Sequence, residues 1–347
     1  MRIAILGSGA MGTVMGAYFA KNGLDPELID NYQAHVDAMR EKGARVTGCA
    51  DFTVPVNAYT TDEMSGVYDL VFLFTKQLAN AELLPRLTKH LGPDSTVCTL
   101  QNGVPEPFVA QYVGEKRTVG GTVLWGATFV EPGVSELTQD ITKTGVLFDV
   151  GEISGEITPR IKAVAQVLEK MGPVLITDKL MAARWGKLVN NACMSGMSAV
   201  CGATFGEVRA DPKARACLSY LGREVKACCD AEGYAMPDLL GGISPECLSF
   251  NSAGGFADSQ RAFWDMYKEL QSAKASMLQD LEKGRPTEVG MINGYVCQTG
   301  RRLGIPTPFN DRVVEIVGRI ERGTLTCSME NLSLFEPEWF EYDFIDI

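Results

Sequence analysis

The first half of the chain alternates short apolar runs rich in β-branched residues with stretches of helical period. Strand-like runs cover residues 2–6, 26–29, 70–74, 96–100 and 117–121, and helical patterns cover residues 33–42 and 79–90. Further strand signals follow at 123–128, 145–148 and 174–176, with one helical pattern at 158–171. Strands that alternate with helices predict an α/β domain with a doubly wound parallel sheet, here over residues 1–177.

The pattern changes from Thr177 onward, where strand signals stop. Long helical patterns follow at residues 178–200, 212–232, 260–283 and 287–303. They predict an all-α second domain over residues 178–325. Residues 326–347 are acidic and aromatic, and their pattern predicts no element.

Composition and charge narrow the classes of function. The 347 residues include 32 basic and 43 acidic side chains, for a net charge of −11, and no run of Lys or Arg occurs. This balance argues against nucleic acid or a membrane as a partner, although a few local donors can still hold a small anion. Ten scattered cysteines without a C-x-x-C, and only two histidines, predict no metal site and a reduced, cytoplasmic protein.

Residues 3–20 carry no charge and resemble a signal peptide after Arg2. Four glycines inside this stretch would make a poor apolar region, so we expect no secretion signal. The glycines form a different motif, which consists of Gly7, Ser8, Gly9, Ala10, Met11 and Gly12. A G-x-G-x-x-G directly after a strand and before a helix is typical of dinucleotide binding, because the helix N-terminus offers free N–H donors to the pyrophosphate.

The second predicted strand ends in Asp30, which is 23 residues after the first glycine of the motif. A carboxylate at this position accepts hydrogen bonds from the adenine ribose hydroxyls and repels a 2′-phosphate. Asn31 follows, and the nearest basic residue, Arg40, lies on the next predicted helix. The local chemistry therefore favours NAD(H) over NADP(H). The competing interpretation is that Asp30 only caps that helix.

A hydride transfer to a carbonyl also needs a proton donor. We expect His35 and His90 to be remote surface residues, so the search moves to lysine. Lys187, Asn191 and Ser195 are spaced four residues apart in an otherwise apolar helical pattern, which places an ammonium, an amide and a hydroxyl on one stripe. Burial in such a helix lowers the pKa of a lysine toward useful values, although a lysine that only extends to the surface is the alternative.

Several of these segments resemble the ketopantoate reductases (2-dehydropantoate 2-reductases). The resemblance covers nearly the whole chain to about residue 325 and rests on residues 7–12, 100–104, 185–188, 276–280, 285–289 and 292–294, with Asn191. It implies a Rossmann domain joined to a helical domain like that of 6-phosphogluconate dehydrogenase, with the active site in the cleft between them. It also implies a homodimer through the helical domain.

The resemblance implies roles for individual residues. Lys187 would protonate the forming alkoxide, and Glu288 would bond the substrate hydroxyl and orient that lysine. Asn102 would lie near the nicotinamide and its ribose, and Lys76 would lie close to the cofactor. Two further residues, Asn191 and Ser276, would hold polar groups of the substrate. Structural roles remain open for Glu288 as a charge in the first turn of a helix and for Asn102 as a turn residue.

Two positions depart from the family pattern. Ser195 stands where the family has a second asparagine, and Asp30 departs from the usual NADP-type pattern. The leading hypothesis is a cytoplasmic reductase that converts 2-dehydropantoate to (R)-pantoate with NAD(P)H, for pantothenate and coenzyme A synthesis. The first alternative is an NAD-dependent D-2-hydroxyacid dehydrogenase for another branched or aromatic 2-oxo acid. A second is a non-catalytic regulator that binds NAD(H).

Overall fold

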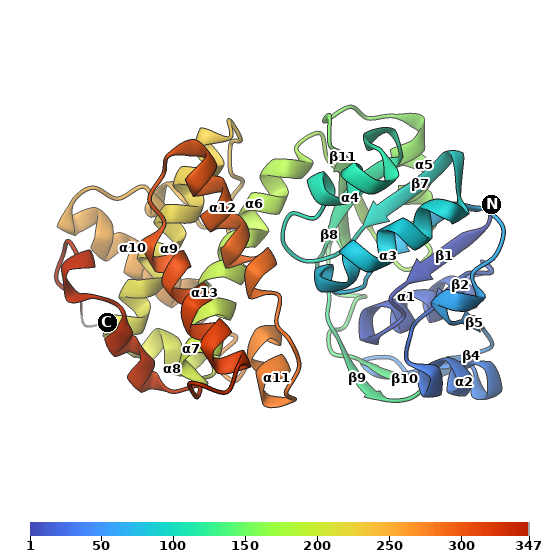
Figure 1. The fold of residues 1–347 in the computed structure, drawn as a ribbon, viewed down its shortest axis with the longest axis horizontal. Coiled ribbons are helices and arrows are strands. Elements are labelled where there is room, and N and C mark those ends of the chain that lie inside the picture. The colour runs from blue at the N-terminus through green and yellow to red at the C-terminus, as the bar shows by residue number, and fades with distance from the viewer. Residues whose placement is uncertain (346–347) are drawn as a thin grey trace. The chain divides into compact units, whose positions relative to one another are not determined.

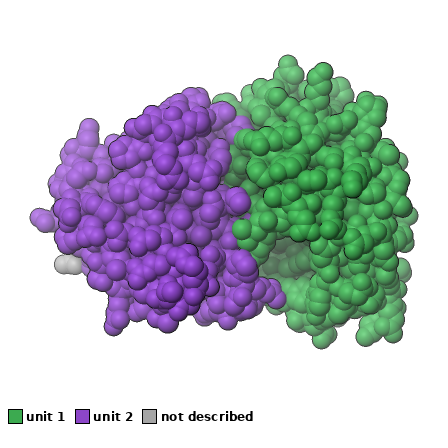
Figure 2. Space-filling model, viewed as in Figure 1, with its two compact units in different colours: residues 1–180 green, residues 181–347 purple. Residues whose placement is uncertain are grey.

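The computed structural model describes residues 1–345 and divides into two compact units, residues 1–180 and 181–347. Unit 1 is an α/β domain and unit 2 is helical (Figures 1 and 2). The predicted fold class is therefore confirmed. Each unit is described by itself below.

Unit 1 is built on an eight-stranded sheet with the order β12-β11-β8-β7-β6-β1-β2-β5. Its strands are β1 (Ile3–Leu6), β2 (Glu27–Ile29), β5 (Asn57–Tyr59), β6 (Tyr68–Leu73), β7 (Leu91–Thr99), β8 (Thr118–Val123), β11 (Phe148–Glu152) and β12 (Val174–Ile176). All neighbours pair in parallel except β8 and β11. The chain moves outward from β1 in one direction to β2 and in the other to β6. Ligands bind at such a switch point, beyond the carboxyl ends of the strands.

Helices cover both faces of this sheet, as the ribbon in Figure 1 shows. They are α1 (Ala10–Lys21), α2 (Gln33–Lys42), α3 (Asn80–Leu87), α4 (Glu106–Val113) and α5 (Pro159–Leu168). Ile3 and Ile5 of β1 pack into a core with α1 and α5, whereas Ala4 and Leu6 pack into a second core with α3 and α4. All four residues of the strand are buried, because a strand covered on both faces needs a continuous apolar run.

A second, four-stranded sheet was not predicted. It runs β4-β3-β10-β9 and consists of β3 (Ala44–Gly48), β4 (Phe52–Val54), β9 (Ala127–Glu131) and β10 (Val134–Leu137). These strands are short and half-exposed, so their apolar runs are too brief to stand out in the sequence. The strand predicted at 123–128 is wrong as one element, because β8 ends at Val123 and β9 begins at Ala127. The strand predicted at 145–148 begins only at Phe148.

Unit 2 packs its helices around the long, buried α9 (Figure 1). Its helices are α6 (Leu180–Asn190), α7 (Gly196–Cys201), α8 (Phe205–Ala210), α9 (Pro212–Ala231), α10 (Ala253–Met266), α11 (Ser276–Glu282), α12 (Asn293–Leu303) and α13 (Pro308–Glu321). A π turn at Asn191–Ser195 joins α6 to α7. The helix predicted at 260–283 is two helices, α10 and α11, and α13 was not predicted.

Short 3₁₀ helices fill several connections. They cover Thr61–Glu63, Gln77–Ala79, Thr88–His90, Glu115–Arg117, Pro245–Leu248, Val289–Met291, Met329–Leu334 and Pro337–Trp339. The last two lie in the acidic aromatic tail, which packs on α9 and α13. Phe335 lies 5.9 Å from Phe309 between ring centroids, and Phe340 lies 5.6 Å from Tyr220. The tail therefore completes the aromatic core of unit 2.

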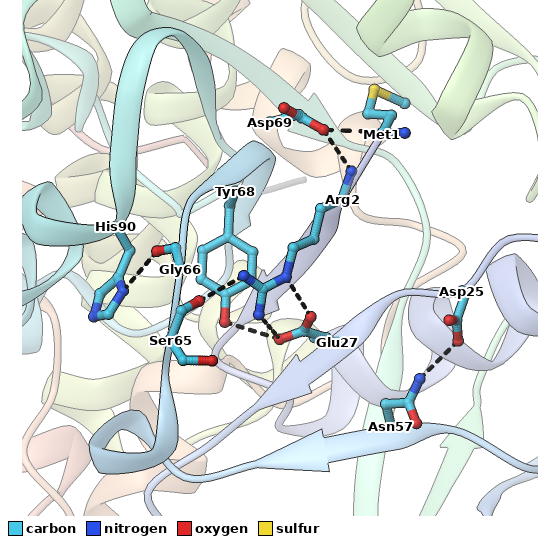
Figure 3. Close-up of polar contacts among 10 residues, drawn as sticks. All are labelled: Met1, Arg2, Asp25, Glu27, Asn57, Ser65, Gly66, Tyr68, Asp69 and His90. Carbon is cyan, nitrogen blue, oxygen red and sulfur yellow. Dashed lines mark hydrogen bonds and ion pairs between the residues drawn. The ribbon is translucent and has the colours of Figure 1, made fainter.

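At the amino ends of β1, β2 and β6 a polar cluster ties the first strands together (Figure 3). The Arg2 guanidinium bonds Glu27 at 2.6 Å and lies 4.3 Å from the centroid of the Tyr68 ring. The Tyr68 hydroxyl donates to the same Glu27 carboxylate at 2.9 Å. This cluster lies at the sheet edge opposite the G-x-G-x-x-G loop.

All ten cysteines are free thiols, and seven of them are buried, as expected for small core residues. Among residues 1–345, no group of three or more potential metal ligands comes together. Within the same range, no helix has the length and apolar character of a membrane span.

Candidate active site

The G-x-G-x-x-G loop connects β1 to α1. Gly7 has a φ of +94°, and a Cβ on it would lie only 2.4 Å from the Thr75 backbone nitrogen. The N–H groups of Gly7 and Ser8 donate to the Ile29 carbonyl at 2.8 and 3.0 Å. Only glycine fits this close turn, which anchors the loop to the carboxyl ends of β2 and β6.

The other two glycines have different functions. A Cβ on Gly12 would lie 2.5 Å from the Gly7 carbonyl oxygen, so this glycine allows α1 to pack against the loop. A Cβ on Gly9 would meet nothing within 4 Å. Packing does not require glycine there, and the missing side chain leaves the backbone open to a ligand at the start of a 12-residue helix.

A pocket of about 400 Å³ opens at this loop. Its walls include Gly7, Gly9, Ala10, Met11, Gly12, Asp30 and Lys76, all of them predicted cofactor residues. Ser8 was also predicted, but its side chain is fully buried and donates to the Ile5 carbonyl at 3.0 Å, so the residue can serve a ligand only through its backbone. Lys76 is exposed and follows β6. The residues fit a dinucleotide.

Asp30 combines two contacts. Its carboxylate accepts the Tyr32 N–H at 2.9 Å, which holds the turn into α2, and the residue also lines the pocket. Arg40 pairs with Glu63 at 2.6 Å and does not line the pocket. The sequence reasoning missed Arg86, which lines the pocket from α3 and pairs with Asp62 at 2.9 Å. Its position depends on how α3 packs, so no local motif marks it.

Asn102 follows β7 at the same edge of the sheet and is half-buried. The Gln77 side-chain amide donates to the Asn102 carbonyl at 2.5 Å. The neighbouring Gln101 amide donates to the Thr75 carbonyl at 2.6 Å and to Asn80 at 2.8 Å. These bonds join the loops after β6 and β7 and hold the backbone that carries Asn102.

In unit 2, Lys187 lies on α6 between the fully buried Trp185 and Leu188. Burial, and to a lesser extent the charge of Arg184, lowers the pKa of Lys187 to about 7. A lysine with a pKa near neutrality is present both as the ammonium, which donates a proton, and as the neutral amine, which accepts one. The lysine therefore has the acid strength that the sequence hypothesis requires.

The π turn changes the geometry of the predicted stripe. In a regular α-helix each step of four residues drifts by about 40°, which would carry Ser195 well away from Lys187. The π turn at Asn191–Ser195 has more residues per turn than an α-helix and counteracts this drift. Within the described residues, the buried Nδ2 of Asn191 has no acceptor. This donor is available to a ligand.

A buried polar network holds the π turn in place. The Asn293 amide donates to the Ala192 carbonyl and to the Asn310 side chain, both at 2.9 Å. Asn310 in turn donates to the Glu224 carboxylate, from its backbone at 2.9 Å and its side chain at 2.7 Å. Burial raises the pKa of Glu224 to about 7. The sequence reasoning missed Glu224 and Asn310, which bond to each other although they are 86 residues apart in the chain.

Two further predicted residues lie on neighbouring segments. Glu288 is half-buried and directly precedes the Val289–Met291 helix that leads into α12. The rings of Trp185 and Tyr295 lie 5.6 Å apart, so α12 packs beside α6 (Figure 1). Ser276 is the exposed first residue of α11, a helix that packs on α7 and the π turn. The structure therefore brings the segments of Lys187, Glu288 and Ser276 together in unit 2.

The expectation for the histidines is half wrong. His35 is not a surface residue: it is buried with 1% of its surface exposed, because α2 packs its ring against the G-x-G-x-x-G loop. His90 is half-buried at the opposite sheet edge, where its Nδ1 donates to the Gly66 carbonyl at 3.0 Å (Figure 3).

Comparison with known proteins decides the family. The profile of the ketopantoate reductase PanE/ApbA family matches residues 3–147, and that of its C-terminal domain matches residues 179–321. The chain belongs to the ketopantoate reductase family. It is therefore an NAD(P)-dependent reductase.

Individual relatives show how wide the family is. The 2-dehydropantoate 2-reductase of Mesorhizobium japonicum is 28% identical, with 93% of this chain and 99% of the relative covered. The ketopantoate reductase of Ralstonia eutropha has a TM-score of 0.79 at 24% identity, with coverage of 93% and 99%. A D-mandelate dehydrogenase with NADH and anilino(oxo)acetate also has a TM-score of 0.79, at 22% identity and the same coverage. These two structural likenesses show a shared fold.

Proposed function

We propose that the protein reduces 2-dehydropantoate to (R)-pantoate, with NADH as the preferred cofactor. The observation that carries the proposal is the environment of Lys187. Its pKa is lowered to about 7, and it lies one helical turn before Asn191, whose buried Nδ2 has no acceptor among the described residues. The 2-dehydropantoate 2-reductases similar to this chain over more than nine-tenths of its length support the substrate. The Asp30 carboxylate in the pocket wall supports NADH, because it would repel a 2′-phosphate.

The dinucleotide supplies the hydride when bound, and the chain's own residues do the rest. The glycine loop and the N-terminus of α1 bind the pyrophosphate. The Asp30 carboxylate accepts hydrogen bonds from the ribose hydroxyls. Lys76 and Asn102 position the nicotinamide half. Asn191, Ser195 and Ser276 hold the carboxylate and hydroxyl of the 2-oxo acid.

Lys187 completes the reaction. As charge develops on the carbonyl oxygen, its ammonium group donates a proton to that oxygen, which gives the hydroxyl and leaves a neutral amine. The lowered pKa makes this transfer easier than it would be from an ordinary lysine. Glu288 accepts a hydrogen bond from the substrate hydroxyl and orients the amine of Lys187. Solvent then returns the proton to Lys187.

A second candidate follows from one position. Ser195 is shorter than the asparagine that the family has there, and it lies in the π turn with 7% of its surface exposed. A shorter side chain leaves room for a bulkier acid. The protein would then be an NADH-dependent D-2-hydroxyacid dehydrogenase for a branched or aromatic 2-oxo acid. The lowered pKa of Lys187 argues against a regulator that only binds the cofactor.

The test is the initial rate of reduction of 2-dehydropantoate with NADH and, separately, with NADPH. The same assay is run with phenylglyoxylate and with 3-methyl-2-oxobutanoate. We expect the highest kcat/KM for 2-dehydropantoate with NADH. A higher kcat/KM for one of the other acids would establish the second candidate. Tight NADH binding without turnover of any acid would instead indicate the regulator.

A further inference from the structure

His35 carries chemistry that the reaction does not use. It lies in the first turn of α2, and its ring is buried between the loop and the hairpin of β9 and β10. Tyr32 stacks near it at 6.5 Å, and the edge of Phe129 lies 5.1 Å away, both between ring centroids. A buried imidazole must satisfy both ring nitrogens, so its contacts are informative.

The contacts of the ring set its proton arrangement. The Gly133 N–H, in the turn between β9 and β10, donates to Nδ1 at 2.9 Å. A nitrogen that accepts an N–H carries no proton of its own, so His35 is neutral with its proton on Nε2. Nε2 therefore donates, and it lies 2.7 Å from the Ser8 carbonyl oxygen and 3.0 Å from the Thr13 hydroxyl oxygen. The Thr13 hydroxyl donates to the Ser8 carbonyl oxygen at 2.6 Å.

Two donors thus hold the Ser8 carbonyl toward the protein interior. In a trans peptide the C=O and the following N–H point in opposite directions. The structure contains no cis peptide among its described residues, so the Gly9 N–H is directed away from His35. Gly9 lines the cofactor pocket, and its missing side chain leaves that backbone open.

We propose that His35 is a positioning residue for the dinucleotide: it orients the Ser8–Gly9 peptide so that the Gly9 N–H faces the pyrophosphate. The proposal rests on the cofactor site of the proposed function and adds a residue outside the glycine motif. It also explains what the second sheet contributes. The Gly133 turn of that sheet keeps the imidazole in the tautomer that donates to the loop.

The test is binding of NADH, measured by fluorescence titration, and of ADP-ribose, measured by calorimetry, without any 2-oxo acid. H35F keeps an aromatic ring at this position but removes the hydrogen bonds to the Ser8 carbonyl and from the Gly133 N–H. We expect binding of NADH and of ADP-ribose to weaken at least tenfold. H35Q keeps an amide donor and should recover most of the affinity. T13V removes the other bond to the same carbonyl and should weaken binding severalfold. H90Q is the matched control and should bind like the wild type.

A merely structural role gives a different pattern. It would lower the melting temperature of H35F and leave its dissociation constants within twofold of the wild type, and that result would overturn the proposal. If H35F does not fold, unchanged binding in T13V overturns the proposal. If the wild type binds neither ligand, the cofactor site of the proposed function is itself wrong.

Discussion

The proposed function draws on the two units in different ways. In unit 1 the proposed cofactor pocket is lined mainly by one continuous loop, where Gly9 leaves the backbone open to a ligand. In unit 2 the proposed residues are single side chains on α6, the π turn, α11 and the segment before α12. A backbone site depends on local conformation, whereas a side-chain site depends on the packing of distant segments. Substitutions in the two units should therefore separate cofactor binding from turnover.

The sharpest separation should come from Lys187→Ala. Removal of the proton donor should lower kcat about 10³-fold, because the group acts mainly in the transition state. The dissociation constant for NADH, measured by fluorescence, should stay within twofold of the wild type. Lys179→Ala, an exposed lysine just before the same helix, serves as the control. Turnover near the wild-type rate in Lys187→Ala would contradict the mechanism.

The pH profile should show the same separation with a somewhat smaller effect. Reduction needs protonated Lys187, and its pKa is lowered to about 7, so kcat should fall as pH rises above 7, by about 50-fold from pH 7 to pH 9. Oxidation of the 2-hydroxy acid needs the neutral amine, and its rate should instead rise through pH 7. Lys187→Arg stays protonated, so its low rate should not follow this profile. If the wild-type rate of reduction did not change between pH 7 and pH 9, the assignment of Lys187 would be refuted.

Asn293→Ala tests whether the buried network matters for turnover. The variant leaves the Ala192 carbonyl and the Asn310 side chain without this donor, so we expect about 2 kcal/mol less stability in urea unfolding. Displacement of Asn191 should also lower kcat/KM about 30-fold. Asn331→Ala is the control, because the Asn331 side chain also donates to two acceptors in unit 2, the Val200 and Thr326 carbonyls, neither of which lies in the π turn. Equal losses of kcat/KM in both variants would mean that only stability matters.

The smallest effect is expected in unit 1, from Asp30→Asn. The amide still accepts the Tyr32 N–H but no longer repels a 2′-phosphate. The ratio of kcat/KM with NADH to that with NADPH should fall about tenfold, with Lys76 and Arg86 as the basic residues in the pocket wall. Asp37→Asn, on the exposed side of α2, should leave the ratio unchanged. An unchanged ratio in Asp30→Asn would show that Asp30 only holds its turn.

Sequence reasoning was strongest where a function depends on local conformation. The alternation of strands and helices predicted the fold class, and the glycine spacing predicted the loop at which the pocket opens. The apolar helix around Lys187 predicted a lowered pKa. The glycine signal and the lysine signal each lie within about 25 residues of chain, because dihedral preferences and side-chain periodicity act over short distances.

The remaining features depend on contacts between distant parts of the chain. His35 is buried against a turn of the second sheet, where the N–H of Gly133, 98 residues away, donates to its ring. The π turn is held by Asn293, which lies 101 residues beyond Ala192. Neither bond leaves a pattern in the segments that make it, since a buried polar group finds its partner only when the core packs. Local sequence thus indicated the candidate residues, and tertiary packing set the pKa of Lys187 and the orientation of the His35 ring.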